Sequence, residues 1–483
     1  MKTLRILATA LALLQVGPAL ALDRVLPAPR IKDNGDVRLS DDLKIGRYQG
    51  GKFISQPDAI QIQGPGSTGP VDGMSVTPLP GMVARALSTS LADLPVRPEQ
   101  YKLASDPDDT LSFQRAAATG RTIALQDGKT YILCAAVPLT RLVGLGGIAT
   151  IKACPGFPYV GGVEPFGSFF YNPNYLAGQI TDTNLLVANV RFDGTDITAN
   201  GAHPSTGEFH AIKFRMARDI LIENVHCVRV GDCTALQATD RSIVRNSTAT
   251  LVTNVGFDHW EGSSNALVEN TTTTCDPTTA SEAGIMFSGA SSTLANRQTV
   301  NPTSRGNRIL YGACKSGVFF NQLSAGSSTV NAVSENDTVD AAGVTTAGGI
   351  IMEGNVQGGR ITGLTVLNGN GPTAISLRQD TAGSGKPKDI LVDGPRVYNW
   401  TTDGANYSPF TLFGTGHVLT NALLKGGTNS TSVATDSATT VVSGTFNPGT
   451  TFGPVQAVGG TFTNPGCRVA GTVASPGTAT ACN

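Results

Sequence analysis

One short strand-like unit recurs along the middle of the chain, and it limits the possible folds more than any other feature. Each copy begins at a small residue and then alternates large apolar side chains with other types; the copies begin at positions 211, 233, 256, 284, 317, 349 and 374. The steps between them are 22, 23, 28, 33, 32 and 25 residues. A step near 22 fits one turn of a three-sided solenoid, and longer steps leave room for loops. A single turn cannot bury its apolar side, so the core must come from stacked turns about 4.8 Å apart.

A second unit is a short apolar strand that ends in a small or polar residue. Its copies begin at Ile220, Ile243 and Leu267 and end at Asn224, Asn246 and Asn270, and looser copies begin at Ile309, Ile361 and Ile390. The composition agrees, because 57 of 483 residues are Gly and only 15 % are charged. Long helices favour more Leu, Glu and Lys, whereas tight corners favour Gly and Asn. We therefore expect an all-β protein whose main part is a parallel β-helix.

The stretch from Asp106 to Leu133 predicts how that solenoid begins. Asp106-Pro107-Asp108-Asp109-Thr110 offers helix-capping side chains, and a short helix is expected over 111–118. Strands are expected over 122–125 and 130–133, separated by an Asp-Gly turn. This order resembles the entrance cap of the pectate-lyase-like right-handed parallel β-helix superfamily, which includes polysaccharide lyases, glycoside hydrolases, uronan epimerases and phage tailspike depolymerases. The resemblance covers roughly thirty residues and implies the fold rather than a reaction.

The ends of the chain predict export and two flanking segments. Lys2 and Arg5, an apolar stretch over 6–16 and Ala19-Leu20-Ala21 have the order of a signal peptide over 1–21, although an N-terminal core helix is the alternative. Residues 22–105 are irregular and are interpreted as an attachment or capping segment. The β-helix is expected over 106–420, followed by a Thr-, Ser- and Gly-rich region over 421–483. This region is expected to be a β-rich tail that caps the solenoid or mediates oligomerisation, and a disordered linker is the alternative. The product is expected to be secreted, extracellular or periplasmic.

Eight cysteines fit an oxidising compartment, where an even number indicates disulfides. Neighbours in sequence are the expected partners, because a short segment of solenoid keeps them close. The predicted pairs are Cys134–Cys154, Cys227–Cys233, Cys275–Cys314 and Cys467–Cys482. None has the spacing of a zinc site.

The charge balance and hydropathy limit the kinds of partner that this protein can bind. A net charge of −1 gives no general attraction to nucleic acid or to an anionic membrane. No stretch after the signal peptide is long and apolar enough to cross a bilayer. We expect a polysaccharide partner and a monomer or homotrimer.

Alternation within the first unit predicts one long outward face. Offsets one and three from the small residue are mostly apolar and should point inward, so offsets two and four should point out. From turn to turn the outward positions are Lys213/Arg215, Ala235/Gln237, Asp258/Trp260, Met286/Ser288, Phe319/Asn321, Ile351/Glu353 and Ser376/Arg378. Cations, amides and aromatic rings suit a sugar chain. The substrate-binding candidates are Lys213, Arg215, Gln237, Trp260, Asn321, Glu353 and Arg378 on an exposed face; an ordinary solvated surface is the alternative.

The sharpest catalytic candidate is the run Gly256-Phe257-Asp258-His259-Trp260-Glu261-Gly262. Asp258 should point outward, and Glu261 follows at the corner. Two close carboxylates can divide the acid and base roles of glycosidic cleavage. Asp258 and Lys213 share one offset two turns apart, about 10 Å by strand spacing, so one sugar unit can bridge them.

Two partial motifs add candidates. Gly256-Phe257-Asp258 is similar to the catalytic strand of mannuronan epimerases, where Asp-Pro-His follows Gly-Phe; here no proline intervenes, and Trp260 stands where the resemblance implies a histidine. His259 has an inward offset, so a core histidine and a catalytic base are both open. Gly231-Asp232-Cys233 resembles the Gly-Asp-Asp-Cys of polygalacturonase-like hydrolases, with one Asp instead of two, and this resemblance makes Asp232 a candidate.

Weaker candidates complete the set. His210 and Glu208 lie beside the Lys213 strand and suit a base or a plain surface role. Asp193 and Asp196 suit calcium, but a turn pair of Asp residues is more common, so no metal or cofactor is predicted.

The leading hypothesis is a secreted enzyme that cuts an acidic polysaccharide, either as a hydrolase using Asp258 with Glu261 or as a lyase using Lys213 or Arg215 beside Asp258. The alternatives are a non-catalytic adhesin or tailspike-like surface protein and a uronan C5-epimerase.

Overall fold

The computed structural model divides the chain into two compact units, residues 1–91 and 92–483. It describes residues 94–427 and, outside this range, only the strands named below; within the range it omits 156, 158–166, 200–208, 280, 290–297, 311–313, 323–326, 343–347, 380–384 and 403–407. The signal peptide over 1–21, Glu208, Cys467 and Cys482 lie outside the described residues. The boundaries expected at 105 and 420 stay predictions.

The first unit contains two small antiparallel sheets. One has four strands in sequence order, β1 (Arg30–Ile31), β2 (Asp36–Arg38), β3 (Lys44–Gln49) and β4 (Lys52–Ser55). The other pairs β5 (Ser75–Val76) with β6 (Arg85–Ala86).

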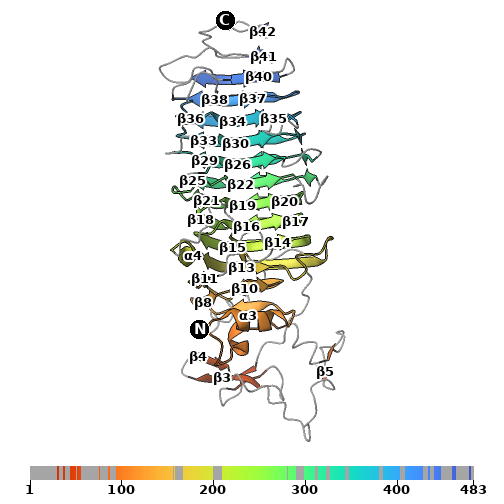
Figure 1. Ribbon diagram of the computed structural model, residues 1–483, viewed down its shortest axis with the longest axis vertical. Coiled ribbons are helices and arrows are strands. Elements are labelled where there is room, and N and C mark those ends of the chain that lie inside the picture. The colour runs from red at the N-terminus through yellow and green to blue at the C-terminus, as the bar shows by residue number, and fades with distance from the viewer. Residues whose placement is uncertain are drawn as a thin grey trace. The chain divides into compact units, whose positions relative to one another are not determined.

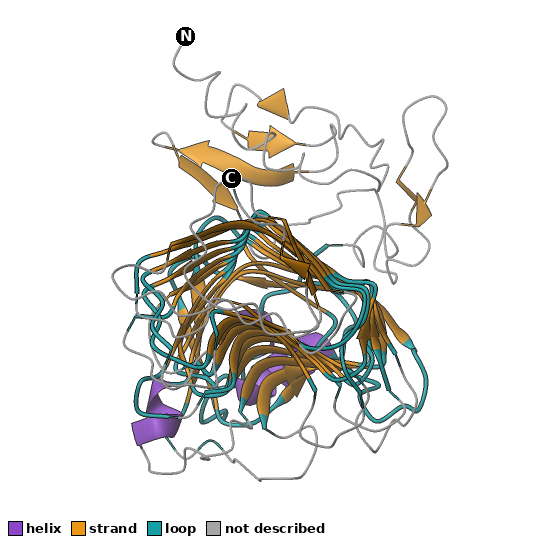
Figure 2. Ribbon diagram, turned by 90° about the horizontal axis from the view of Figure 1, so that it is seen from above, coloured by secondary structure: helices purple, strands orange, loops and turns teal. Residues whose placement is uncertain are grey.

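The second unit is a parallel β-helix, as the repeats predict. Strands from successive turns lie side by side in the column of Figure 1 and superpose in the end-on view of Figure 2. Every pairing in the 11-stranded sheet is parallel. Its members, in chain order, are β9 (Val137–Pro138), β12 (Ser168–Tyr171), β14 (His210–Arg215), β16 (Asp232–Gln237), β19 (Val255–Trp260), β22 (Ala283–Ser288), β26 (Ser316–Asn321), β30 (Gly348–Glu353), β34 (Thr373–Arg378), β37 (Phe410–Leu412) and β39 (Val433–Thr435).

The other two sides of each turn belong to a 25-stranded sheet. Its first strands are β7 (Ile123–Leu125), β8 (Thr130–Leu133), β10 (Arg141–Gly144), β11 (Ala149–Ala153), β13 (Asp182–Asp193), β15 (Ala217–Val228), β17 (Asp240–Arg245), β18 (Thr248–Val252), β20 (Ser264–Glu269), β21 (Thr272–Cys275), β23 (Thr299–Val300), β24 (Thr303–Arg305) and β25 (Arg308–Leu310). It continues with β27 (Thr329–Val330), β28 (Val333–Glu335), β29 (Thr338–Asp340), β31 (Val356–Gln357), β32 (Arg360–Thr362), β33 (Thr365–Leu367), β35 (Leu391–Asp393), β36 (Arg396–Tyr398), β38 (Val418–Lys425), β40 (Thr440–Asn447), β41 (Gly460–Thr463) and β42 (Thr478–Ala479).

The interior of the solenoid is built from the inward offsets of the 11-stranded sheet, as predicted. Ile212, Phe214, Ile285 and Phe287 are fully buried in one continuous core, and the Phe287 and Phe320 rings stack at 5.1 Å. The small residue that begins each unit is also explained. A Cβ atom on Gly317 would lie 2.5 Å from the Gly349 carbonyl oxygen of the next turn, so the turns approach too closely there for a larger side chain.

The corner between the two sides of the large sheet explains why the second unit ends in Asn or Gly. Asn224, Asn246 and Asn270 have φ of 50–52°, in the left-handed region, and the aligned turns place Gly306 and Gly363 at the same corner with φ of 63°. Asn adopts this conformation more readily than most residues, and Gly does so without a Cβ penalty. One side-chain bond along this row, from Asn224 Nδ2 to Asn189 Oδ1, is 2.9 Å.

Just before that corner, one outward row of the large sheet alternates in charge. Glu223, Arg245, Glu269, Arg305 and Glu335 occupy equivalent positions on five successive turns. Arg245 Nε lies 2.9 Å from Glu223 Oε1, and Arg305 lies 2.6 Å from Glu269 Oε2. We call this set the charge ladder.

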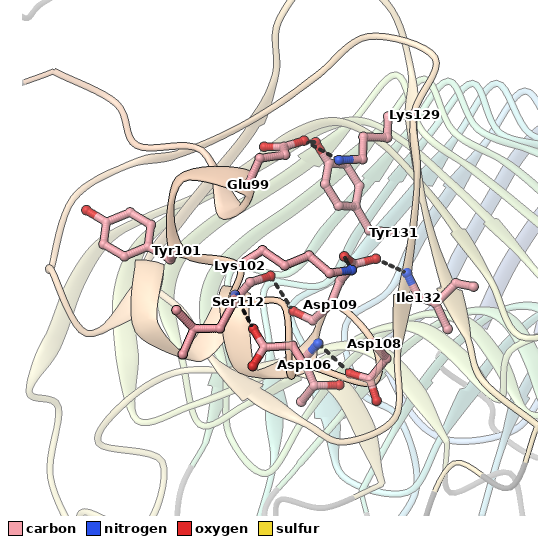
Figure 3. Close-up of polar contacts among 12 residues, drawn as sticks. Glu99, Tyr101, Lys102, Asp106, Asp108, Asp109, Ser112, Lys129, Tyr131 and Ile132 are labelled. Atoms are coloured by element: carbon pink, nitrogen blue, oxygen red, sulfur yellow. Dashed lines mark hydrogen bonds and ion pairs between the residues drawn. The ribbon is translucent and has the colours of Figure 1, made fainter. Parts of the chain in front are cut away.

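The solenoid begins with the predicted cap. The 3-10 helix η2 (Pro98–Tyr101) precedes helix α3 (Thr110–Ala117), whose Phe113 packs edge-on against Tyr131 at 5.3 Å. Figure 3 shows how the acidic run is used: Asp108 accepts a 2.6 Å hydrogen bond from the Thr110 N–H, whereas Asp109 bonds Lys102 and the Ile132 N–H. Asp109 holds the N-cap position but makes no side-chain cap bond; Asp108 instead accepts the first N–H of the helix, and Asp109 joins the helix to strand β8.

Three of the four predicted disulfides are present. Cys134–Cys154, Cys227–Cys233 and Cys275–Cys314 have Cα atoms 5.2, 5.5 and 5.3 Å apart. The Cys227–Cys233 bridge joins the end of β15 to the start of β16 and closes the turn that carries Asp232. Among the described residues no helix is long and apolar enough to cross a membrane. A short helix, α4 (Thr195–Ala199), follows β13.

Candidate functional site

The outward side of the 11-stranded sheet carries the two rows expected from alternation. The Asp258 row consists of Lys213, Ala235, Asp258, Met286, Phe319, Ile351 and Ser376, which pair in direct register. The Trp260 row consists of Arg215, Gln237, Trp260, Ser288, Asn321, Glu353 and Arg378. Asp258 and Lys213 are thus two turns apart in the same row, as predicted.

The expectation of an exposed face is wrong. Every member of the Asp258 row is buried, and Phe319 is only 7 % exposed instead of offering an open stacking surface. In the Trp260 row, Arg215, Trp260 and Arg378 are partly buried and the other four are buried. Alternation fixes which way a side chain points, but it does not report what lies above the sheet.

Asp258 is the most perturbed carboxyl group of this face. It is 5 % exposed, and its Oδ1 has no hydrogen-bond partner. Burial raises the pKa of Asp258 well above its usual value, and the negative charges of Asp232 and Glu282 raise it further, while Lys213 opposes the shift. A carboxyl group in this position keeps its proton where ordinary Asp side chains have lost theirs.

Asp232 is held in place from two sides at the start of β16. His210 Nδ1 lies 2.8 Å from Asp232 Oδ2, and the Val255 backbone N–H donates a 2.8 Å hydrogen bond to Asp232 Oδ1. Both side chains are buried, and the Cys227–Cys233 disulfide braces the turn before them. The structure therefore brings Asp232 and His210 into the surroundings of Asp258, where Asp232 contributes the largest charge effect on the Asp258 pKa.

Glu261 has a different neighbourhood from the one expected. It adopts a left-handed φ of 55°, is 2 % exposed, and accepts a hydrogen bond from Gln237 Nε2. Tyr175 OH in turn donates to Gln237 Oε1 at 3.0 Å, and the Tyr175 ring lies within 6 Å of the Lys213 and Arg215 cations. Gln237 thus bonds protein groups, and Glu261 contributes the smallest of the carboxylate effects on Asp258.

Two members of this neighbourhood were missed by sequence reasoning. Tyr175 lies between β12 and β13, outside any repeat, so no pattern points to it. Glu282 has a position that recurs in the repeats: it lies two residues before the small residue Gly284, as Gly231 lies two residues before Cys233 two turns earlier. Burial raises the pKa of Glu282, and Lys315 partly offsets this effect.

His259 belongs to the core and not to the site. Its ring is fully buried, stacks on Phe287 at 5.2 Å, and has no hydrogen-bond partner at either nitrogen. Burial lowers the pKa of His259 to about 3. The inward offset is confirmed, and the neutral ring faces away from Asp258.

The remaining candidates lie apart from Asp258. Glu353 and Arg378 bond each other, with Arg378 Nε 2.6 Å from Glu353 Oε2. Asp193 accepts the Thr195 N–H, and Asp196 pairs with Lys152 at 3.1 Å, so these two serve local structure. Within the described ranges no group of three or more His, Cys, Asp or Glu side chains could hold a metal ion.

Comparison with known proteins finds similarity among solved structures only. No family model and no curated protein matches the chain. Among solved structures, the exopolygalacturonase of Thermotoga maritima is 14 % identical, with 69 % of this chain and 87 % of that chain covered and a TM-score of 0.45. The Streptococcus pneumoniae surface adhesin PfbA is 14 % identical, over 77 % and 93 % of the two chains, with a TM-score of 0.44. The tailspike of Escherichia coli bacteriophage HK620, in complex with a pentasaccharide, is 13 % identical over 78 % and 80 %, with a TM-score of 0.47.

The fold itself rests on the strand pairing of this chain. A cap helix, parallel turns and an Asn-rich corner are all present, so the expectation of a parallel β-helix is confirmed. These likenesses do not bear on activity, which must be argued from the residues around Asp258.

Proposed function

We propose that this protein hydrolyses the glycosidic bonds of a polysaccharide at the Asp258 row. Asp258 acts as the general acid and protonates the leaving oxygen. The Asp232 carboxylate serves as the base or nucleophile on the other side of the glycosidic bond. The observation that carries the proposal is a buried carboxyl group with a raised pKa beside a second carboxylate fixed by His210 and a backbone N–H. Glycosidic hydrolysis requires one carboxyl group that donates a proton and a second that acts as base or nucleophile.

The raised pKa of Asp258 also disfavours a lyase that uses this side chain as its base. Such a lyase needs an unprotonated base to remove a proton from a uronate, and a protonated Asp258 cannot do this. Lys213 and Arg215 suit a carboxylate-bearing sugar at the β14 end of the site, so an acidic polysaccharide stays part of the proposal. Three disulfides fit a protein that works outside the reducing cytosol, in agreement with the predicted export.

The test is a panel of neutral and uronic-acid polysaccharides incubated with the purified protein. We expect new reducing ends without the absorbance of unsaturated uronates. Asp258→Asn should lower kcat by about 10²–10⁴-fold, the usual contribution of general acid catalysis. Unsaturated products would instead support the lyase, and binding without any chain cleavage would support an adhesin.

A matched control separates catalysis from general damage. Asp337 is also a buried carboxyl group with a raised pKa, but it bonds Asn307 and Ser334 within the large sheet. Asp337→Asn should leave kcat unchanged. Asp258→Asn should have nearly the same stability as the wild type near neutral pH, because burial favours the uncharged form of Asp258 and Asn is an uncharged side chain of almost the same shape.

A further inference from the structure

The outward face changes character on the far side of Asp258 from Lys213. Met286, Phe319 and Ile351 follow Asp258 in its row on three successive turns. Together with Val255 and Ala283 they form a buried apolar cluster that is separate from the solenoid core. A row that binds a fully hydroxylated or charged sugar would not be built from these side chains.

Two unpaired polar atoms lie in the row alongside this cluster. Ser288 Oγ and Asn321 Oδ1 occupy paired positions on β22 and β26, and neither has a hydrogen-bond partner. Ser288 is fully buried and Asn321 is 5 % exposed. A buried polar atom without a partner destabilises the folded protein, and native proteins leave few of them. Their unused bonding capacity points to a ligand that supplies the missing groups.

No charged side chain lies in either row on β22 or β26. The nearby Glu282 and Glu353 would repel a uronate, and Arg378 is already paired with Glu353. A desolvated carboxylate placed here would therefore lack a cation. The chemistry fits a neutral group with one apolar and one hydrogen-bonding side.

We propose that the β22–β26 part of the face is a subsite for a neutral sugar unit that carries a methyl group, as N-acetyl, O-acetyl and 6-deoxy sugars do. The methyl group packs against the small part of Met286 and Phe319 that stays exposed, 7 % of each, and sugar hydroxyl or amide hydrogens are donated to Ser288 Oγ and Asn321 Oδ1. The inference deepens the proposed function, because the subsite adjoins Asp258. The substrate then has an acidic unit at the β14 end and this neutral unit beyond the cleaved bond.

The test is binding to an array of oligosaccharides in matched sets: methyl-bearing neutral units, the same units without the methyl group, and uronic acids. Asp258→Asn protein is used beside the wild type, so that bound glycans are not cut. We expect methyl-bearing units to bind roughly 10–200-fold more tightly than their matched partners, the range for small apolar groups in a fitted pocket. Equal binding across the matched sets would overturn the proposal.

Two substitutions in the Asp258→Asn background locate the binding. Phe319→Ser should abolish the preference for methyl-bearing units, whereas Leu391→Ser, an exposed apolar residue on β35, should keep it. Because Phe319→Ser can destabilise the fold, Ser288→Ala is the second variant: it should weaken binding while the melting temperature stays equal or rises, since an unpaired hydroxyl is removed. Unchanged binding by Ser288→Ala would mean that this hydroxyl faces only buried water, and would also overturn the subsite.

The two proposals fail in different ways. Selective binding of methyl-bearing units without chain cleavage by the wild type would end the hydrolase proposal and keep the subsite. Chain cleavage by the wild type without selective binding of methyl-bearing units would end the subsite proposal and keep the hydrolase proposal.

Discussion

Asp258 and His259 are adjacent in sequence and have opposite surroundings. Alternation along β19 turns Asp258 to the outward row and His259 into the core between apolar neighbours. Burial disfavours the charged form of both, so the pKa of Asp258 rises and that of His259 falls. One side chain is left protonated and the other neutral, and only the first is placed for proton transfer to a substrate.

We expect His259→Leu to be more stable than the wild type by about 1–2 kcal/mol, because two buried ring nitrogens without partners are removed. The gain should grow as the pH falls from 6.5 toward 3, since the unfolded histidine binds a proton in this window and the folded one does not. Urea denaturation at several pH values measures it. Lost activity in a stable His259→Leu protein would contradict the core assignment.

The rate should depend on pH through Asp258. Because the acid must be protonated, kcat/KM should fall as the pH rises through the raised pKa of Asp258. Lys213→Met removes a positive charge that lowers this pKa, so the falling limb should move to higher pH. A profile whose alkaline limb is unmoved in Lys213→Met would contradict the coupling between these two side chains.

At the scale of single residues, the sequence predicts which way a side chain points but not which groups it contacts. The inward place of His259 and the common row of Lys213 and Asp258 follow from a period of two and are confirmed. The burial of that row and the role of Tyr175 do not follow, because they depend on segments without repeats. Proximity in sequence favours Glu261 over Asp232 as the second carboxylate beside Asp258. In the stacked turns, however, Asp232 has the larger electrostatic effect on the pKa of Asp258.

At the scale of a single turn, the corner residue decides whether two strands can meet at an angle. The left-handed φ at Asn246 costs most residues about 1–2 kcal/mol, and Asn and Gly pay less. The sequence signal was the recurring Asn or Gly after each apolar strand, and the structure supplies its physical cause. Loop lengths between turns carry no such signal, which is why the steps of 28 to 33 residues could not be placed in detail.

Asn246→Ala should therefore lower the free energy of unfolding by about 1–2 kcal/mol. Asn246→Gly should cost less, because glycine adopts a positive φ freely. Thermal or urea denaturation of the two variants against the wild type gives the order. If Ala were tolerated as well as Gly, backbone conformation would not be what selects Asn at this corner.

At the scale of the whole solenoid, each turn contacts mainly the turns before and after it, so stability is close to a sum over neighbours. The overall class, the cap and three disulfides could be predicted because they repeat or lie close in sequence. The division of the chain into units at residue 91 has no comparable signal, since no repeat ends there.

A whole turn should be removable far from Asp258. Deleting residues 363–393 joins Thr362 to Gly394, which holds the same corner position as Gly363, and brings β36 to pair with β29. We expect a folded protein with a lower urea midpoint and an unchanged kcat, measured on the same preparation. A deletion that yields only aggregated protein would show that the turns are not interchangeable modules.

The charge ladder bears on how so uniform a stack finds one arrangement. Turns of nearly equal width could slip past each other by one whole step with little change in backbone hydrogen bonding. Because Glu and Arg alternate along the ladder, a turn that paired with the next turn but one would set Glu opposite Glu or Arg opposite Arg at that junction. The alternation therefore disfavours a stack that leaves out a single turn anywhere between Glu223 and Glu335, and like-charge repulsion on the outer surface helps to set the native order of the turns.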